Sequence, residues 1–181
     1  VQEMSDVTFA VDSSDPLTVT AGLEVYDCSK SRPAINSVNL EVGRDVLIPL
    51  AKKYNALLFA NASGKDGIPN TKEERVENLE QIMSMMDEEG IPMEDRYLDP
   101  LAFPVGAAPE APQHYLDAVS ELRIKYPEVH LFGGHSNTSF GMPQRKVLNS
   151  AFVIRSIISG CDALMIDPVM DPEGFSYEKK A

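Results

Sequence analysis

The chain has 181 residues, of which 43% are hydrophobic and 24% are charged, with 16 Lys and Arg against 28 Asp and Glu. This composition is typical of a globular domain with a substantial core and excludes wholesale disorder. The formal net charge of −12 disfavours nucleic acid and anionic membrane surfaces as partners, and no apolar run reaches the roughly 18 residues that a membrane span needs. With no secretion signal and two widely separated cysteines, Cys28 and Cys161, we expect a cytoplasmic protein.

Short apolar runs alternate along the chain with segments of helical periodicity. Strands are predicted, in chain order, at 8–11, 34–35, 56–59, 96–98, 129–132 and 163–166. Helices are predicted between them at 16–25, 45–54, 71–89, 112–126 and 145–159. The helix at 71–89 has the clearest boundaries, with a Thr71/Glu74 capping box at its start and Gly90 at its end. The helix at 145–159 is expected to bury Leu148, Phe152 and Ile158.

This alternation predicts a parallel α/β sheet covered by helices. The strand-to-strand spacing is about 31 residues, so eight such units would need about 248 residues, close to the size of a (β/α)8 TIM barrel. We therefore expect an incomplete barrel containing strands three to eight, with the first two βα units missing, and one partial domain spanning 1–181. A complete six-stranded open sheet is the alternative, although the glycine-rich dinucleotide and Walker motifs that such sheets often carry are absent.

An acid or an amide residue stands at or just after the end of every predicted strand. These residues are Asp12, Asn36, Asn61, Asp99, Asn137 and Asp167. Each alone could be a helix cap, because Asp and Asn are favoured at that position. Together, with Lys and Arg missing from the same places, they predict a binding site at the carboxyl edge of the sheet. Carboxylates and amides can pair with the alternating C=O and N–H groups of an aminopyrimidinone ring, so a pterin is the expected ligand.

The three histidines do not show the spacing of a metal site. His114 is predicted on a helix and His130 on a strand, and only His135 lies near a strand end. We therefore expect no metal ion, and we interpret His135 as a loop or wall residue, with an acid/base role as the alternative.

The motifs at the strand ends resemble, in order and spacing, those of the pterin-binding methyltransferases. They are Val11-Asp12-Ser13-Ser14, Ile35-Asn36-Ser37, Asp66-Gly67-Ile68-Pro69, Leu98-Asp99-Pro100-Leu101, the run from Gly134 to Gly141 and the run from Gln144 to Asn149. The resemblance is greatest to methyltetrahydrofolate:corrinoid/iron-sulfur protein methyltransferase and to the tetrahydrofolate methyltransferases of corrinoid-dependent demethylation systems. It implies a TIM barrel and a function in one-carbon metabolism.

The resemblance also implies roles for individual residues. Asp12, Asn36 and Asp99 match positions that hydrogen-bond the pterin ring, and Asn137 matches the catalytic amide that reaches the methyl-bearing N5 atom. Two further pocket positions match Ser136 and Arg145. Asn61 has no counterpart in the family and is predicted to bind the pterin only from its place at a strand end.

The implied activity is methyl transfer between N5 of methyltetrahydrofolate and the cobalt of a corrinoid (cobalamin) carried by a partner protein, in an enzyme that forms a homodimer. A dihydropteroate synthase-like pterin enzyme is one alternative, although the basic residues that would hold a pyrophosphate group are missing. A non-catalytic pterin-binding remnant is another. Because an incomplete barrel leaves strand edges unpaired, we expect the 181-residue chain by itself to be weakly active or inactive.

Overall fold

The computed structural model describes residues 1–166, which form one parallel sheet and its covering helices. The strands are β1 (Ala10–Asp12), β2 (Ala34–Val38), β3 (Leu57–Asn61), β4 (Arg96–Asp99) and β5 (His130–Leu131), and they pair in the order β1-β2-β3-β4-β5. An open doubly wound sheet reverses its strand order at one point, whereas this order follows the chain throughout. The described strands are therefore an arc of consecutive (β/α)8 barrel units, as predicted.

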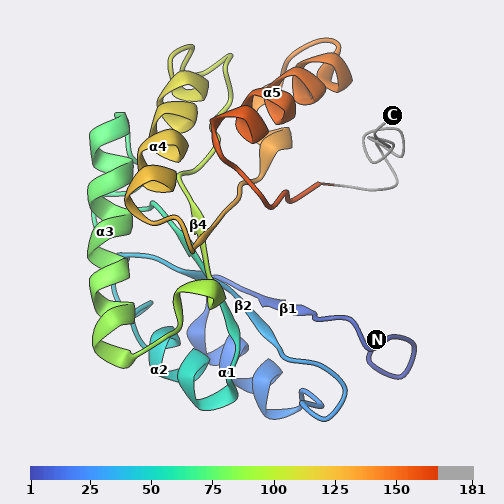
Figure 1. The fold of residues 1–181 in the computed structure, drawn as a ribbon. Coiled ribbons are helices and arrows are strands. Elements are labelled where there is room, and N and C mark those ends of the chain that lie inside the picture. Colours follow the sequence, from blue (N-terminus) through green and yellow to red (C-terminus); the bar gives the residue numbers. More distant parts are fainter. Residues whose placement is uncertain (167–181) are drawn as a thin grey trace.

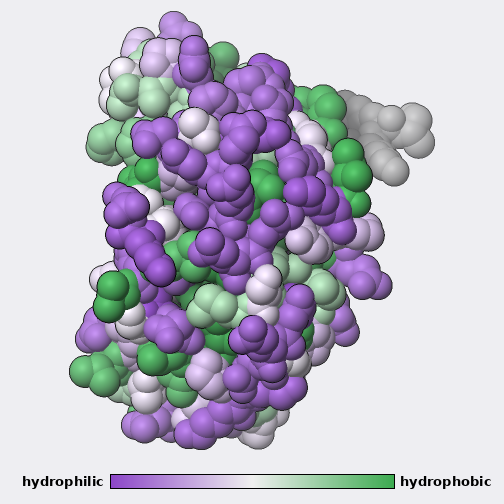
Figure 2. Space-filling view, turned by 90° about the vertical axis from the view of Figure 1, so that its left-hand side faces the viewer, coloured by the Kyte–Doolittle hydropathy of each residue, from purple (hydrophilic) through white to green (hydrophobic). Residues whose placement is uncertain are grey.

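Helices follow the strands in regular alternation. They are α1 (Pro16–Glu24), α2 (Leu47–Tyr54), α3 (Lys72–Glu89), α4 (Ala111–Lys125) and α5 (Arg145–Ser159), with short 3-10 helices η1 (Met93–Asp95) and η2 (His135–Ser139). Each α-helix packs against the next one along the chain, around the outer side of the arc (Figure 1). Hydrophilic side chains cover most of the face that carries α3 (Figure 2). Among the helices of residues 1–166, none is long and apolar enough to cross a membrane.

The core lies between the sheet and the helices. It is built from fully buried aliphatic side chains on both layers, among them Ile35, Leu58 and Leu98 on strands and Leu23, Leu79, Ile82, Val119 and Leu122 on helices. Because side chains alternate across a strand, the intervening residues point to the concave face. There the ring centroids of Phe59 and Tyr97 lie 4.6 Å apart, and those of Tyr97 and His130 lie 4.5 Å apart.

The boundaries of α3 confirm the predicted caps. The Thr71 hydroxyl oxygen accepts a hydrogen bond from the backbone N–H of Glu74, and Gly90 ends the helix in the left-handed conformation with φ 73°. The return bond of the capping box differs from the prediction, because the Glu74 carboxylate accepts from the N–H of Asn70 at 2.6 Å, one residue before Thr71. Two N-terminal amides are still satisfied, as helix ends require.

Two predictions about the C-terminal third need correction. Ile158 was expected to face inward but is 79% exposed, because it lies six residues after the buried Phe152 and therefore points about 120° away from it. No strand is assigned at 163–166, although the N–H groups of Ala163 and Met165 donate to the carbonyls of Leu131 and Gly133 at 3.1 and 3.2 Å. This segment thus follows β5 in parallel, but too briefly to count as a strand. Asp167 lies outside the described residues.

A candidate binding site at the carboxyl edge of the sheet

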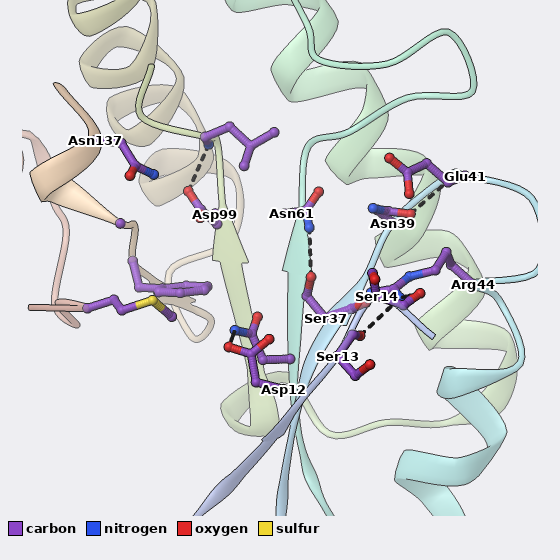
Figure 3. Close-up of a pocket in the computed structure, with 15 residues that line it drawn as sticks. Asp12, Ser13, Ser14, Ser37, Asn39, Glu41, Arg44, Asn61, Asp99 and Asn137 are labelled. Carbon is purple, nitrogen blue, oxygen red and sulfur yellow. Dashed lines mark hydrogen bonds between the residues drawn. The ribbon is translucent and has the colours of Figure 1, made fainter. Parts of the chain in front are cut away.

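Five of the predicted strand-end residues meet around one cavity of about 300 Å³. They are Asp12, Asn36, Asn61, Asp99 and Asn137. The first four are residues of successive strands, and Asn137 belongs to η2 after β5. Figure 3 shows Asp12, Asn61, Asp99 and Asn137 around this common space, each from a different segment. The parallel sheet brings them together because all of its strands end at the same edge.

The alternative interpretation, that these residues cap helices, does not hold. The N-cap residues of the five α-helices described within residues 1–166 are Asp15, Val46, Thr71, Glu110 and Gln144, and none of these is a strand-end residue of the cavity. None of the strand-end acids and amides is therefore used to cap one of these α-helices.

Asp12 and Asn36 lie opposite each other on neighbouring strands and form the first side of the cavity. In the register of β1 and β2 they are paired residues, and Asn36 Nδ2 donates to Asp12 Oδ2 at 3.1 Å. This bond uses one of the two amide protons of Asn36. No other residue of the described part, 1–166, bonds the Asn36 carbonyl oxygen or the second Asp12 oxygen, so both can accept from a ligand. The pair thus presents acceptors and one donor side by side.

Asp99, at the end of β4, is the most buried acid of the cavity. One of its oxygens, Oδ1, accepts from the backbone N–H of Leu101 at 2.7 Å, and the side chain makes no other hydrogen bond with residues 1–166. Burial raises the pKa of Asp99 to about 7, against the smaller opposing effects of the Leu101 bond and the positive charge of Arg75. A ligand that offers N–H groups would replace the lost water and favour the ionised carboxylate.

Asn61 and Asn137 differ in how many of their polar atoms are already used. Asn61 Nδ2 donates to Ser37 Oγ at 2.7 Å, and its oxygen accepts from the N–H of Ser63 at 3.0 Å. The side-chain amide of Asn137 has no hydrogen-bond partner among residues 1–166 while it lines the cavity. Asn61 therefore shapes the site, whereas Asn137 has both a donor and an acceptor to offer.

Ser136 and Arg145, the remaining predicted site residues, lie close to each other but do not line this cavity. Arg145 Nη2 donates to the carbonyl of Ser136 at 2.9 Å, and Arg145 Nε donates to Ser139 Oγ at 3.0 Å. These bonds hold the η2 segment that carries Asn137. Direct contact of either side chain with a ligand stays a prediction.

Arg44 belongs to the cavity wall and was not predicted from the sequence. Its side chain is buried, and its guanidinium donates to the carbonyl of Ser13 at 3.1 Å and to those of Ser14 and Ser37 (Figure 3). It therefore ties the segment after β1 to β2, next to the Asp12–Asn36 pair. No motif marks this residue, because its partners are backbone carbonyls of two other segments.

His135 begins η2 and does not line the cavity. It is fully buried, and burial lowers the pKa of its imidazole to about 4, so the ring is neutral at pH 7. Its Nε2 lies 3.4 Å from the Tyr115 hydroxyl. His135 was predicted to be a loop or wall residue, and it lies in η2 without lining the cavity; its burial disfavours the alternative acid/base role. Within residues 1–166, no group of three His, Cys, Asp or Glu side chains is placed to hold a metal ion.

Comparisons with known proteins agree with the chemistry of the cavity. The sequence profile of a family described as "Pterin binding enzyme" matches residues 1–167. The chain is 30% identical over 171 residues to the methylcorrinoid:tetrahydrofolate methyltransferase of Eubacterium limosum, covering 93% of this chain and 62% of that protein. It is 28% identical over 175 residues to the methionine synthase of Mycobacterium tuberculosis (strain ATCC 25618 / H37Rv), covering 90% of this chain and 14% of that protein.

A solved structure supports the assignment of the fold. The chain superposes on the crystal structure of the Yersinia pestis dihydropteroate synthase with a TM-score of 0.69 and 18% sequence identity, covering 96% of this chain and 71% of that one. At this identity the likeness concerns the fold alone, and it confirms the (β/α)8 arc. The chain spans about 62% of the length of the E. limosum relative, and a much smaller share of the methionine synthase.

Proposed function

Because this chain belongs to the family of pterin-binding enzymes, we propose that its strand-end cavity holds the pterin ring of methyltetrahydrofolate. We propose further that the bound folate exchanges its N5 methyl group with the cobalt of a corrinoid carried by a partner protein. The names of the two curated relatives support folate methyl transfer as the general activity. The observation that carries the proposal is the convergence of Asp12, Asn36, Asp99 and Asn137 on one cavity.

The donors and acceptors of the cavity suit the edge of a pterin. The aminopyrimidinone end of the ring carries adjacent N–H groups, and a carboxylate can accept two parallel N–H bonds. Asp99 is placed for this because residues 1–166 use only one of its oxygens. Asn36 and Asp12 can complete the pairing from the neighbouring strands, since together they offer an amide oxygen and a carboxylate oxygen.

In the reaction, the chain has to orient the ring and stabilise N5 as its bond to the methyl carbon breaks. N5 is a poor leaving group unless it gains a proton or a hydrogen bond. The side-chain amide of Asn137, which has no hydrogen-bond partner among residues 1–166, can donate to N5, and a bond that strengthens in the transition state lowers the barrier. The corrinoid, when bound over the cavity, supplies the cobalt that accepts or donates the methyl group.

Dihydropteroate synthesis fits the cavity less well. That reaction releases pyrophosphate, which calls for free cationic groups. The one cation lining the described cavity is Arg44, and its two Nη atoms are already bonded to backbone carbonyls. A non-catalytic pterin-binding role is the second candidate, and the experiment below separates it from methyl transfer.

The test measures methyl transfer from 5-methyltetrahydrofolate to free cob(I)alamin by absorbance under anaerobic conditions, in the natural protein that carries this sequence. We expect transfer in the wild type. In Asn137→Ala we expect kcat to fall about 100- to 1000-fold, as when one oxyanion-hole donor is removed, with a smaller loss of folate affinity. Asn70→Ala is the matched control, because Asn70 is exposed and lies outside the cavity.

Three results would contradict the proposal. Failure of the wild type to bind methyltetrahydrofolate would refute the pterin site itself. Binding without transfer would support the non-catalytic candidate. Normal transfer by Asn137→Ala would show that this amide does not act at N5.

A further inference from the structure

Arg75, in the first turn of α3, is a buried cation that the proposed reaction does not use. Only 1% of its surface is exposed. Charged side chains are rarely buried this completely unless their charge is compensated. Among residues 1–166, its Nε atom has no hydrogen-bond partner, and its guanidinium forms no direct ion pair. The compensation therefore has to come from its other hydrogen bonds and from charges that do not touch it.

The hydrogen bonds of Arg75 join two segments that leave neighbouring strands. Its Nη1 atom donates to the carbonyl of Pro69, which follows β3, and to the carbonyl of Pro100, which follows β4, both at 3.2 Å. Pro69 ends the motif that begins at Asp66, and Pro100 comes directly after Asp99. A single atom on α3 thus connects the two segments at the carboxyl edge of the sheet.

The segment held after β4 contains the turn that orients the Asp99 carboxylate. Asp99 Oδ1 accepts from the N–H of Leu101 at 2.7 Å, and Leu101 has the left-handed conformation with φ 65°. This conformation is uncommon for a residue other than glycine and persists only where the surroundings hold it. The carbonyl between these two residues is the one that Arg75 bonds. The direction of the carboxylate therefore depends on the contact with Arg75.

Arg75 also acts on Asp99 through its charge. Of the acids that act on the Arg75 guanidinium, Asp99 has the largest effect on its pKa and Glu74 a smaller one. In return, the Leu101 hydrogen bond and the charge of Arg75 both lower the pKa of Asp99 against the effect of burial. Charges that are shielded from water interact strongly even when they do not touch. The two buried groups therefore compensate each other in part.

Other titratable and charged groups belong to the segments packed around Asp99. They are Tyr97 on β4, Tyr115 on α4, His130 on β5, His135 on η2, Cys161 after α5, and the cavity-lining Asp12, Glu41 and Arg44. Burial raises the pKa of the two tyrosines and of the cysteine and lowers that of His135, so these groups are neutral at pH 7. The two other acids of the cavity disfavour a further negative charge, which makes a cation beside Asp99 more important.

On the premise that Asp99 binds the pterin as proposed above, we propose that Arg75 is the positioning residue of this carboxylate. Its hydrogen bonds to Pro69 and Pro100 fix the turn that carries Asp99. Its buried charge favours the ionised carboxylate, which is the form that accepts N–H groups from the ring. Arg75 does not touch the ligand and acts on it only through Asp99.

The first measurement needs no ligand. In the natural protein that carries this sequence, carbon-13 NMR of labelled aspartate follows the carboxyl carbon of Asp99, whose signal is identified by its loss in Asp99→Asn. We expect Arg75→Gln to raise the pH midpoint of this signal by about one unit, because the substitution removes the charge but keeps a donor for the carbonyls. Arg75→Lys keeps the charge and should titrate within about 0.3 unit of the wild type.

The second measurement is calorimetric titration with 5-methyltetrahydrofolate between about pH 6 and pH 9. In Arg75→Gln the loss of affinity on acidification should begin about one pH unit higher than in the wild type, which makes the affinity at pH 7 about fivefold lower. Arg75→Lys should recover most of this loss. Arg96→Gln is the matched control, because Arg96 is also buried but lies at the opposite end of β4 and pairs with Asp87 at 2.7 Å. We expect it to leave the Asp99 midpoint unchanged.

An Asp99 midpoint that is the same in Arg75→Gln and in the wild type would overturn the proposal. An equal loss of affinity at every pH would also overturn it, since that result indicates a structural effect alone. If Arg75→Gln does not fold, Arg75→Lys decides, because a midpoint raised by a full unit despite the retained charge would contradict the proposal. Failure of the wild type to bind the folate would overturn the pterin site and this role with it, and the NMR midpoint distinguishes that result from a failure of the interaction between Arg75 and Asp99.

Discussion

The ionisation of Asp99 leads to a prediction that connects stability with ligand binding. Burial raises the pKa of this carboxyl group from the usual 3.8 to about 7. Because the folded-state pKa is the higher one, folding favours the protonated form. The resulting cost to stability is absent below about pH 4, grows as the pH rises, and is complete above about pH 7. Three pKa units correspond to about 4 kcal/mol.

Asp99→Asn removes this cost while keeping the shape of the side chain and an oxygen for the Leu101 N–H. We expect the variant to have a higher free energy of unfolding than the wild type at pH 8. At pH 5, where the wild-type carboxyl is protonated in the folded state, this difference should be smaller by about 2–3 kcal/mol. Urea unfolding at the two pH values measures this change. A stability difference that is the same at pH 5 and pH 8 would refute the reasoning.

The ionisation of Asp99 also affects ligand binding, but in the opposite direction. A higher pH lowers the stability of the fold and raises the affinity for the ligand. A pterin that donates N–H groups needs the carboxylate, so wild-type affinity should be full above about pH 7 and fall about tenfold for each pH unit below it. Asp99→Asn should bind weakly at every pH and lose this dependence. Calorimetric titration between pH 5.5 and 8.5 tests this, and a wild-type affinity that rises on acidification would contradict it.

Three further substitutions test contacts that stabilise the fold and position the site. Arg44→Met should lower pterin affinity more than tenfold in calorimetric titration, because the segment after β1 loses its tie to β2; unchanged affinity would refute that role. Thr71→Ala should lower the free energy of urea unfolding by about 1 kcal/mol without changing ligand affinity. Gly133→Ala should lower the melting temperature, because its Cβ would lie 2.7 Å from the Tyr115 hydroxyl oxygen; an unchanged value would show that Tyr115 moves freely.

The sequence predicts well the features that depend on local pattern. The boundaries of α3 follow from Thr71 and Gly90, and the strand ends follow from apolar runs that stop at an acid or amide. The convergence of Asp12, Asn36 and Asp99 could then be predicted, because parallel strands place all their carboxyl ends at one edge.

Features that depend on long-range packing were not predictable in this way. Arg44 acts through backbone carbonyls of other segments, which no side-chain motif reveals. The inward face of α5 was misjudged at Ile158, because a helix this apolar has several possible faces and only packing selects one. Contact of Asn61 with the ligand stays a prediction, and its place at a strand end did not reveal that its amide bonds Ser37 and Ser63.

A crystal structure of the protein with bound 5-methyltetrahydrofolate would test the central claim most directly. We predict that the aminopyrimidinone edge of the ring lies within hydrogen-bond distance of Asp99 and Asn36, with N5 facing the amide of Asn137. A ring bound elsewhere on the molecule, or turned so that N5 points away from Asn137, would contradict the account.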